Sequence, residues 1–203
     1  IEGQWRDHER WALTVEDFRS DTKGQCTRLK NTFNTSDILC VSATLADYPI
    51  IQNMASYYAY DISEYMGWAQ ENNGTHSIGI DFIKYWHEED TYPFLIKHND
   101  ELVGFVIIDK KVTYPANDFN IAQFFILRKF TGKGIGRRIA IQCFEKFRGR
   151  WEVFVMAGNT GAYRFWKKII GHYSDHQFKE YPKTVGGFDR HVFEFSSQYA
   201  EGL

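Results

Sequence analysis

FFILRKFTGKGIGRRIA, residues 124–140, runs from an apolar stretch through a glycine-rich turn into a segment with the apolar spacing of a helix. Gly132, Gly134 and Gly136 alternate with larger residues in this turn. Because glycine has no Cβ atom, the backbone N–H groups of such a turn can converge on a ligand. A helix that begins near Gly136 adds unpaired N–H groups and the positive end of its dipole. The turn is therefore predicted to bind an anion.

The charges around the turn favour a ligand that carries phosphates. Residues 128–138 contain five positive side chains and no acidic one, although the net charge of the chain is −2. The five are Arg128, Lys129, Lys133, Arg137 and Arg138. The alternative interpretation is a solvated basic helix start, in which the glycines serve only the turn.

Three kinds of phosphate site compete for this turn. A Walker loop needs a Lys and a hydroxyl residue directly after its last glycine, but Arg137 and Arg138 follow Gly136. A dinucleotide fingerprint needs a third glycine at the position of Arg137, so it fits poorly. The remaining candidate is the pyrophosphate of coenzyme A, bound at a strand–turn–helix junction.

Composition indicates one soluble domain. A chain of 203 residues with 43% hydrophobic residues can bury one core. Its net charge of −2 provides no overall positive field for nucleic acid. No apolar run approaches the roughly 20 residues that cross a bilayer. We therefore expect no nucleic acid and no membrane as partners.

Cysteine and histidine positions indicate no metal site. Cys26, Cys40 and Cys143 are far apart, and three cysteines fit poorly with a disulfide framework. Histidines such as His76 and His98 are isolated and lack the spacing of metal ligands. We expect a cytoplasmic protein without a bound metal.

The apolar pattern divides the chain into two parts. Residues 1–36 lack a sustained period and are interpreted as an N-terminal extension of uncertain order, whereas residues 37–203 form the predicted α/β domain with a partly antiparallel sheet. Strands are expected at 38–43, 94–98, 102–109, 119–127, 151–156, near 172–179 and at 190–195. Helices are expected from Asp47 to before Gly67, weakly at 80–88, after the glycine turn, and after Asn159.

Two segments carry a family resemblance. Residues 131–136 resemble the cofactor motif Gln/Arg-x-x-Gly-x-Gly/Ala of the GNAT superfamily of acyl-CoA-dependent N-acyltransferases, with Thr131 at the first position. Downstream, residues 159–167 are similar to the superfamily segment Asn-x-x-Ala-x-x-Phe/Leu-Tyr-Lys. The resemblance covers roughly residues 37–196. Stretches such as YYAYDISEYMG and FWKKII also look like a subgroup of predicted acetyltransferases with unknown substrates.

This resemblance implies a fold and a cofactor site. The implied fold is an α/β (mixed α+β) domain with a central, largely antiparallel sheet, splayed middle strands and flanking helices. Acetyl-CoA would enter between strands 119–127 and 151–156, where the backbone around Ile126 and Arg128 binds its pantetheine arm as an added strand. The implied cofactor-binding residues are Ile126, Leu127, Arg128, Lys133, Gly134, Ile135, Gly136, Arg137, Arg138, Asn159 and Trp166. For Asn159, capping of its helix is an equal interpretation.

The candidate general acid is unsettled. The resemblance implies a Tyr where this chain has Trp166, and an indole N–H is no practical proton donor. Tyr163 lies one helical turn earlier and is a candidate, with a buried core Tyr as the alternative. Water can also protonate the departing thiolate.

The candidate general base is also unsettled. Asn120 and Gln123 occupy strand positions where family members often have a Glu, and an amide can orient a water or a substrate without accepting its proton. Asp118 and Glu152 are the nearest carboxylates, with solvated strand-end charges or a water relay as alternatives.

The acceptor pocket is expected between the first helix and the open ends of the strands. Tyr60, Asp61 and Gln123 are its predicted substrate-binding residues. Aromatic rings with a carboxylate such as Asp61 or Glu64 would suit a small cationic amine. Tyr58 and Tyr65 lie on the apolar face of this helix and are interpreted as core.

These residues favour an acetyl-CoA-dependent N-acetyltransferase that acts on a primary amine of a small molecule. Direct transfer in a ternary complex is expected, because no cysteine lies where the thioester should lie. A catalytically silent acyl-CoA sensor domain and a protein N-acetyltransferase are the alternatives. A monomer or a homodimer is expected by analogy.

Overall fold

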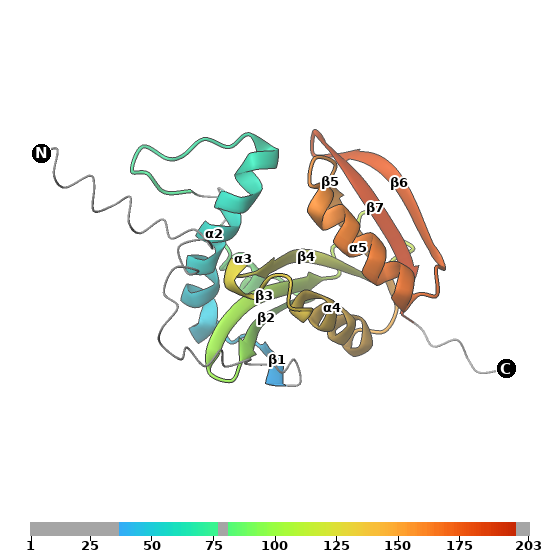
Figure 1. The fold of residues 1–203 in the computed structure, drawn as a ribbon, viewed down its shortest axis with the longest axis horizontal. Coiled ribbons are helices and arrows are strands. Elements are labelled where there is room, and N and C mark those ends of the chain that lie inside the picture. The colour runs from blue at the N-terminus through green and yellow to red at the C-terminus, as the bar shows by residue number, and fades with distance from the viewer. Residues whose placement is uncertain (1–36, 77–80, 198–203) are drawn as a thin grey trace, which may run out of the picture. The chain divides into compact units, whose positions relative to one another are not determined.

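The computed structural model describes residues 37–76 and 81–197. Its centre is a seven-stranded sheet with strand order β1-β2-β3-β4-β5-β7-β6 (Figure 1). Neighbouring strands are antiparallel except β4 and β5, which are parallel. The strands span Ile38–Ser42 (β1), Thr91–His98 (β2), Glu101–Asp109 (β3), Phe119–Ile126 (β4), Arg150–Met156 (β5), Phe178–Val185 (β6) and Phe188–Ser196 (β7). The expected mixed, largely antiparallel sheet is confirmed, while the predicted extension over residues 1–36 lies outside the described residues.

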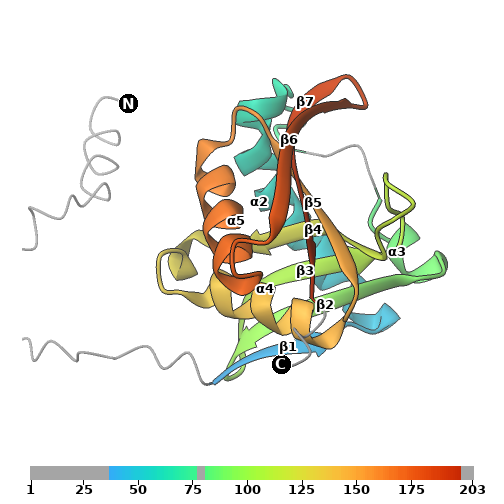
Figure 2. The same ribbon diagram turned by 90° about the vertical axis from the view of Figure 1, so that its right-hand side faces the viewer.

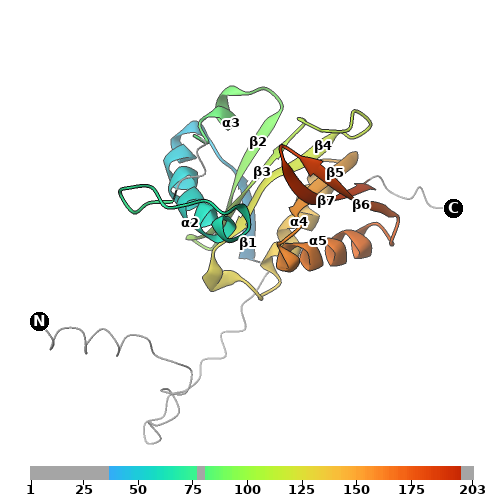
Figure 3. The same ribbon diagram turned by 90° about the horizontal axis from the view of Figure 1, so that it is seen from above.

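Helices cover both faces of this sheet. They span Tyr48–Met66 (α2), Lys84–His87 (α3), Ile135–Lys146 (α4) and Thr160–Tyr173 (α5), with 3-10 turns at Leu45–Asp47 (η3) and Arg128–Phe130 (η4). Figure 2 shows α4 in front of β2 and β3, α5 beside β6 and β7, and α2 behind the sheet. From above, α2 lies on the side of β1 and β2, and α5 lies beside β6 and β7 (Figure 3). This arrangement leaves the middle of the sheet between two helical layers.

Each face of the sheet has its own buried core. On one face, Ile51 and Met54 of α2 pack against Phe105 and Ile107 of β3. On the other face, the buried Phe144 of α4 contacts rings of β5 and β7. The helix signals in the sequence explain how α2 forms, since it has a proline in its first turn and ends at Gly67 in the left-handed conformation.

The two parallel strands separate soon after they meet. β4 pairs with β5 only at Phe119 and Asn120, although β4 stays paired with β3 through Ile126. Just beyond the last shared pair, Ile107 lies opposite Gln123 and Ile108 opposite Ile121, so Ala122 is an extra residue in β4. Such a bulge bends its strand and increases the local twist. The expected splay of the middle strands is therefore present, with a bulge at its start.

The strand predicted near residues 172–179 is wrong in its first half. His172 and Tyr173 complete α5, and the Tyr173 ring packs 5.1 Å from that of Phe144. The chain turns at Asp175 and His176, both in the left-handed conformation, before β6 begins at Phe178. The apolar face of α5 simply continues further than the sequence pattern indicates. Of the weak helix expected at 80–88, residue 80 lies outside the described residues, and within 81–88 only Lys84–His87 is α-helical.

Candidate active site

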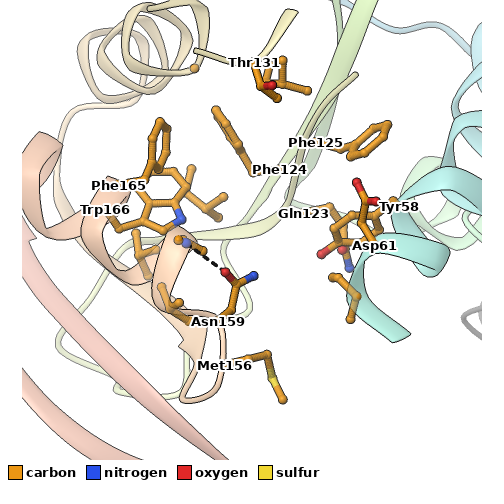
Figure 4. A pocket seen from close by; sticks show the side chains of 18 of the residues that line it. Tyr58, Asp61, Gln123, Phe124, Phe125, Thr131, Met156, Asn159, Phe165 and Trp166 are labelled. Atoms are coloured by element: carbon orange, nitrogen blue, oxygen red, sulfur yellow. Dashed lines mark hydrogen bonds between the residues drawn. The ribbon is translucent and has the colours of Figure 1, made fainter. Parts of the chain in front are cut away.

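A cavity of about 1160 Å³ fills the space between the splayed strands. Its walls come from α2, β4, β5, the glycine turn and α5. Figure 4 shows two groups of side chains around it, with Phe124, Phe165 and Trp166 on the α5 side and Tyr58, Asp61 and Gln123 on the α2 side. The cavity therefore joins the two helical layers through the opening in the sheet.

The strand edge that faces this opening is available for pairing. Beyond Asn120, residues 121–126 of β4 have no partner on β5, so their backbone groups on that side border the cavity. An extended ligand can add to such an edge as an extra strand. Ile126 and Arg128 line the cavity. Leu127 does not, because its N–H donates to the carbonyl of Val103 and its side chain packs against the core.

The glycine turn presents backbone donors to the same cavity. Gly132 and Gly134 have φ values of +74° and +78°, a left-handed conformation that favours glycine. The first bond of α4 runs from the N–H of Arg138 to the carbonyl of Gly134, so the N–H groups of residues 135–137 precede the helix ladder. The N-cap residue is Gly134 itself, which has no capping side chain. The predicted anion seat is thus an uncapped helix N-terminus.

The third glycine of the turn has a packing role. An added Cβ atom at Gly136 would lie 2.9 Å from the Phe165 ring. Glycine at this position therefore lets α4 approach α5 closely, next to the ring that lines the cavity.

The predicted positive residues divide by position. Arg128 and Arg137 line the cavity, and Arg128 forms an exposed ion pair with Asp61 of α2. Lys133 and Arg138 are not among the lining residues, and the Lys133 ammonium lies 5.6 Å from the Phe130 ring. Ile135 is buried, because the helix period turns its side chain into the core, so only its N–H can serve a ligand. Fewer cationic side chains therefore line the cavity near the glycine turn than the sequence alone indicated.

Asn159 and Trp166 lie on the α5 side of the cavity. The Asn159 Oδ1 accepts the N–H of Ala162 at 2.9 Å, which caps α5 and leaves the amide nitrogen directed to the cavity (Figure 4). Both interpretations of Asn159 therefore fit its geometry. The Trp166 ring is buried between Phe124 and Phe165, with centroid distances of 5.1 and 5.0 Å, and its indole nitrogen faces the cavity (Figure 4).

The α2 side of the cavity is aromatic and amide-lined. Gln123 Nε2 donates to the Tyr85 hydroxyl at 3.0 Å, which holds the amide in place. Tyr58 packs against the core rings of Phe105 and Phe125 and also lines the cavity. Burial raises the pKa of Tyr58 and of Tyr85, so neither phenol releases a proton near neutral pH. The sequence pattern placed Tyr58 in the core and missed its second role.

Tyr60 and Asp61 lie at the open rim of this side. Tyr60 is 59% exposed, and its ring contacts the ring of His76 at 5.2 Å. The Asp61 carboxylate forms an ion pair with Arg128, so it attracts a cationic amine less strongly than a free carboxylate would. Within residues 37–76 and 81–197 no group of His, Cys, Asp or Glu side chains could hold a metal ion. No helix in the same ranges is long and apolar enough to cross a membrane.

A family model now identifies the domain. The model of the acetyltransferase (GNAT) family matches residues 54–172, more than half of the chain. The chain belongs to the GNAT family. The match contains most of α2, the glycine turn and most of α5, so it covers the elements that surround the cavity. Membership supports acetyl transfer as the general activity. A search of curated proteins finds no match.

Solved structures share the GNAT fold at low identity. An acetyltransferase from Thermus thermophilus is 14% identical, with a TM-score of 0.57 over 78% of this chain and 96% of that chain. A variant of spermidine N-acetyltransferase from Vibrio cholerae is 14% identical, with a TM-score of 0.55 over 80% and 95%. A dodecameric structure of that enzyme is 13% identical, with a TM-score of 0.52 over 80% and 95%. At these identities the likeness shows the fold alone.

Glu152, a candidate base in this GNAT chain, does not line the cavity. Its side chain is fully buried and accepts the N–H groups of Thr113 at 2.5 Å and Tyr114 at 3.1 Å, and the Asn117 amide at 2.9 Å. Strand alternation turns Glu152 toward the loop that precedes β4. The geometry therefore assigns Glu152 to anchoring that loop, which corrects its proposed catalytic role.

The other two catalytic candidates also point away from the cavity. Asp118 accepts the N–H of Arg150 at 2.7 Å, at the closed end of the parallel strand pair. The Tyr163 hydroxyl donates to Glu180 at 2.6 Å and accepts from Lys167 at 2.8 Å, on the side of α5 that faces β6 and β7. These contacts remove both residues from the expected reaction centre, because sequence neighbours on a strand or helix face different directions.

Glu152→Gln tests this correction. The amide presents a donor to groups that are themselves donors, so the variant should lose about 1–3 kcal/mol of unfolding free energy. Turnover per folded molecule should change less than about threefold, since the side chain lies outside the cavity. Urea unfolding and steady-state assays below the melting range measure the two effects. A turnover loss above a hundredfold with intact folding would restore Glu152 as a base.

Proposed function

We propose that this chain transfers the acetyl group of acetyl-CoA directly to a primary amine of a small molecule. The observation that carries the proposal is the cavity itself. It joins an unpaired strand edge and an uncapped helix N-terminus on one side to a polar, aromatic wall on the other. A donor and an acceptor can therefore meet in one space, which direct transfer requires.

The residues present fit coenzyme A. The free edge of β4 suits the two amides of the pantetheine arm, and the N–H groups of residues 135–137 with Arg137 suit the pyrophosphate. Asn159 directs its amide nitrogen to the path between these two places. When bound, acetyl-CoA supplies an acyl group activated as a thioester. Phe124, Phe165 and Trp166 exclude water around that end of the cavity.

The α2 side would orient the acceptor amine. Gln123 is held by Tyr85, so its carbonyl oxygen can accept an N–H of the amine and direct the lone pair. Among the described lining residues, Asp61 and Glu64 are the carboxylates; Asp61 is paired with Arg128, and Glu64 is exposed. The proton of the amine therefore leaves through water at the open side of the cavity.

A silent acyl-CoA-binding domain is the second candidate function. Two observations favour it: Trp166 stands at the implied Tyr position, and the lining carboxylate Asp61 is already paired with Arg128. Cytoplasmic location and a monomeric or homodimeric state belong to the proposal in the same way, as expectations.

One experiment separates the two functions. Acetyl-CoA and coenzyme A are titrated calorimetrically, and free thiol is then followed with polyamines, aminoglycosides and amino acids. Binding followed by amine-dependent thiol release supports the enzyme. Tight binding without release across the panel favours the silent domain, and no binding refutes both.

Trp166→Phe tests how the thiolate leaves. Phe keeps the ring packing on Phe124 and Phe165 but lacks the indole N–H. Turnover should fall less than about tenfold, against roughly 10²–10⁴ for a lost general acid. The assay is kcat at saturating acetyl-CoA, with calorimetric affinity as the folding and binding control. A larger fall at unchanged affinity would give the indole an essential catalytic role.

A further inference from the structure

Two free cysteines meet where the edge strand β1 packs on α4. Cys40 lies in the middle of β1, and Cys143 lies in the second half of α4. Both line a second cavity of about 250 Å³, and the Cys143 thiol donates a hydrogen bond to the Cys40 sulfur. Neither residue lines the cavity assigned to acetyl transfer. The proposed function therefore leaves this pair of nucleophilic side chains without a role.

The patterns that build β1 and α4 bring the two thiols together. Alternation along β1 turns Ile38 and Cys40 toward the helix, since Ile38 is buried whereas Leu39 on the opposite face is 56% exposed. On α4, Cys143 follows Ile139 by one helical turn in the buried row of the helix. Core packing on both elements thus fixes the direction of each thiol.

The two thiols differ in exposure and in acidity. Cys40 is partly exposed, whereas Cys143 is only 2% exposed. The hydrogen bond from Cys143 and the charge of Lys146, which lines the same cavity, lower the pKa of Cys40 although burial opposes them. The same hydrogen bond and burial raise the pKa of Cys143. Cys40 is therefore the thiol that reacts first, and Cys143 is the thiol that can resolve its product.

We propose that Cys40 and Cys143 form a reversible thiol–disulfide site that reacts with small disulfides and joins β1 to α4 when oxidised. The Cys40 thiolate attacks one sulfur of the disulfide RS–SR, so that the S–S bond breaks and one RS⁻ leaves. The Cys143 thiolate then attacks the Cys40 sulfur and displaces the second RS⁻. The two protein thiols lose two electrons and two protons, and RS–SR is reduced to two RSH. A reducing dithiol reverses both steps.

The new bond would tie an edge strand to a core helix. β1 lies at the end of the sheet and is paired with β2 on one side, so it can move from hydrogen-bond contact to an S–S bond of about 2.05 Å. The bond closes a long loop of the chain, which restricts the unfolded state and stabilises the fold. The inference does not depend on acetyl transfer.

Thiol counting tests the proposal in the full chain. Cys26→Ser removes the third cysteine of the sequence, so that Cys40 and Cys143 are the remaining thiols. The protein is incubated with oxidised glutathione, quenched with acid, unfolded and alkylated, and its intact mass is measured. Both thiols should be lost without retained glutathione, a peptide map should join residues 40 and 143, and dithiothreitol should restore both thiols. Two thiols that stay free, or a glutathione adduct that never resolves, would overturn the inference.

Single variants in the same background assign the two roles. Cys143→Ala lacks the resolving thiol, so the reaction should stop with one glutathione on Cys40. Cys40→Ala leaves the buried thiol alone, and its reaction should be at least about tenfold slower. This second variant changes a partly exposed side chain, so it remains a test even where the change at Cys143 disturbs the core. An equal rate in Cys40→Ala would contradict the assignment of Cys40 as the attacking thiol.

Thermal unfolding tests the tie between β1 and α4. The oxidised chain should melt at least about 5 °C above the reduced chain. Cys40→Ala treated with the same oxidant is the control, and its melting temperature should change by less than about 1 °C. A melting temperature that stays the same or falls on oxidation would show that the bond does not hold β1 on α4 in the native geometry, and the inference would be overturned.

Discussion

Gly134→Asp is expected to abolish measurable coenzyme A binding, with a loss of at least about 100-fold in affinity. Gly134 is the N-cap of α4 and lines the cavity, and no atom lies within 4 Å of the position of an added Cβ. The new carboxylate would occupy the N–H groups of residues 135–137 and repel the phosphates. Isothermal titration with coenzyme A measures the effect.

Gly134→Asn is the matched control. Asn has the shape of Asp without its charge, and both residues tolerate the left-handed backbone better than other side chains do. The Asn variant should therefore fold equally well and lose about tenfold in affinity or less. An Asp variant within threefold of the unmodified chain would refute the pyrophosphate seat. Equal losses in both variants would assign the effect to bulk rather than charge.

Trp151→Ala should cause the largest loss of stability, about 3–5 kcal/mol of unfolding free energy. Trp151 is completely buried, and its ring contacts Phe119, Phe144 and Phe195. Trp151 of β5 lies opposite Phe119 of β4, in the short stretch where these two strands are paired. It therefore packs at the closed end of the strand pair, and the cavity opens beyond this stretch. Chemical denaturation of the ligand-free protein measures the loss.

Trp151→Phe separates ring packing from hydrogen bonding. The indole N–H of Trp151 donates to the Phe147 carbonyl at 3.0 Å and contacts the Ser197 hydroxyl at 3.2 Å. Phe retains most of the ring contacts and loses these bonds, so it should cost about 1–3 kcal/mol. An Ala variant that loses less than Phe would contradict the assignment of Trp151 to the closed end.

Much of the fold follows from short windows of sequence. The proline near the start of α2 and Gly67 after its end mark that helix correctly, and Asn159 caps α5 as expected. The two segments that resemble the GNAT motifs lie side by side on the cavity, where Gly136 packs against Phe165. These features depend on neighbours within a few residues, so local chemistry is sufficient to predict them.

The catalytic candidates show where predictions from short stretches of sequence are wrong. Asp118 and Glu152 lie on or next to the splayed strands in the sequence. The Asp118 carboxylate accepts the N–H of Arg150 at the closed end of these strands, and the Glu152 carboxylate accepts the N–H of Thr113 in the loop that precedes β4. The helix pattern placed Tyr58 in the core, and the structure adds a face on the cavity. A side chain that belongs to a core and to a cavity wall has the same periodicity as one that belongs to the core alone.

The sequence by itself determined the α/β class, the glycine turn with its helix N-terminus, the capping of α5 and membership of an acyltransferase family, because each is encoded in contiguous residues. Only the tertiary structure decided that β4 bulges at Ala122 and leaves β5 after Asn120, and that Asp118, Glu152 and Tyr163 do not line the cavity. Those outcomes depend on the register of strands far apart in the chain. A shift of one residue in that register reverses which face a side chain occupies.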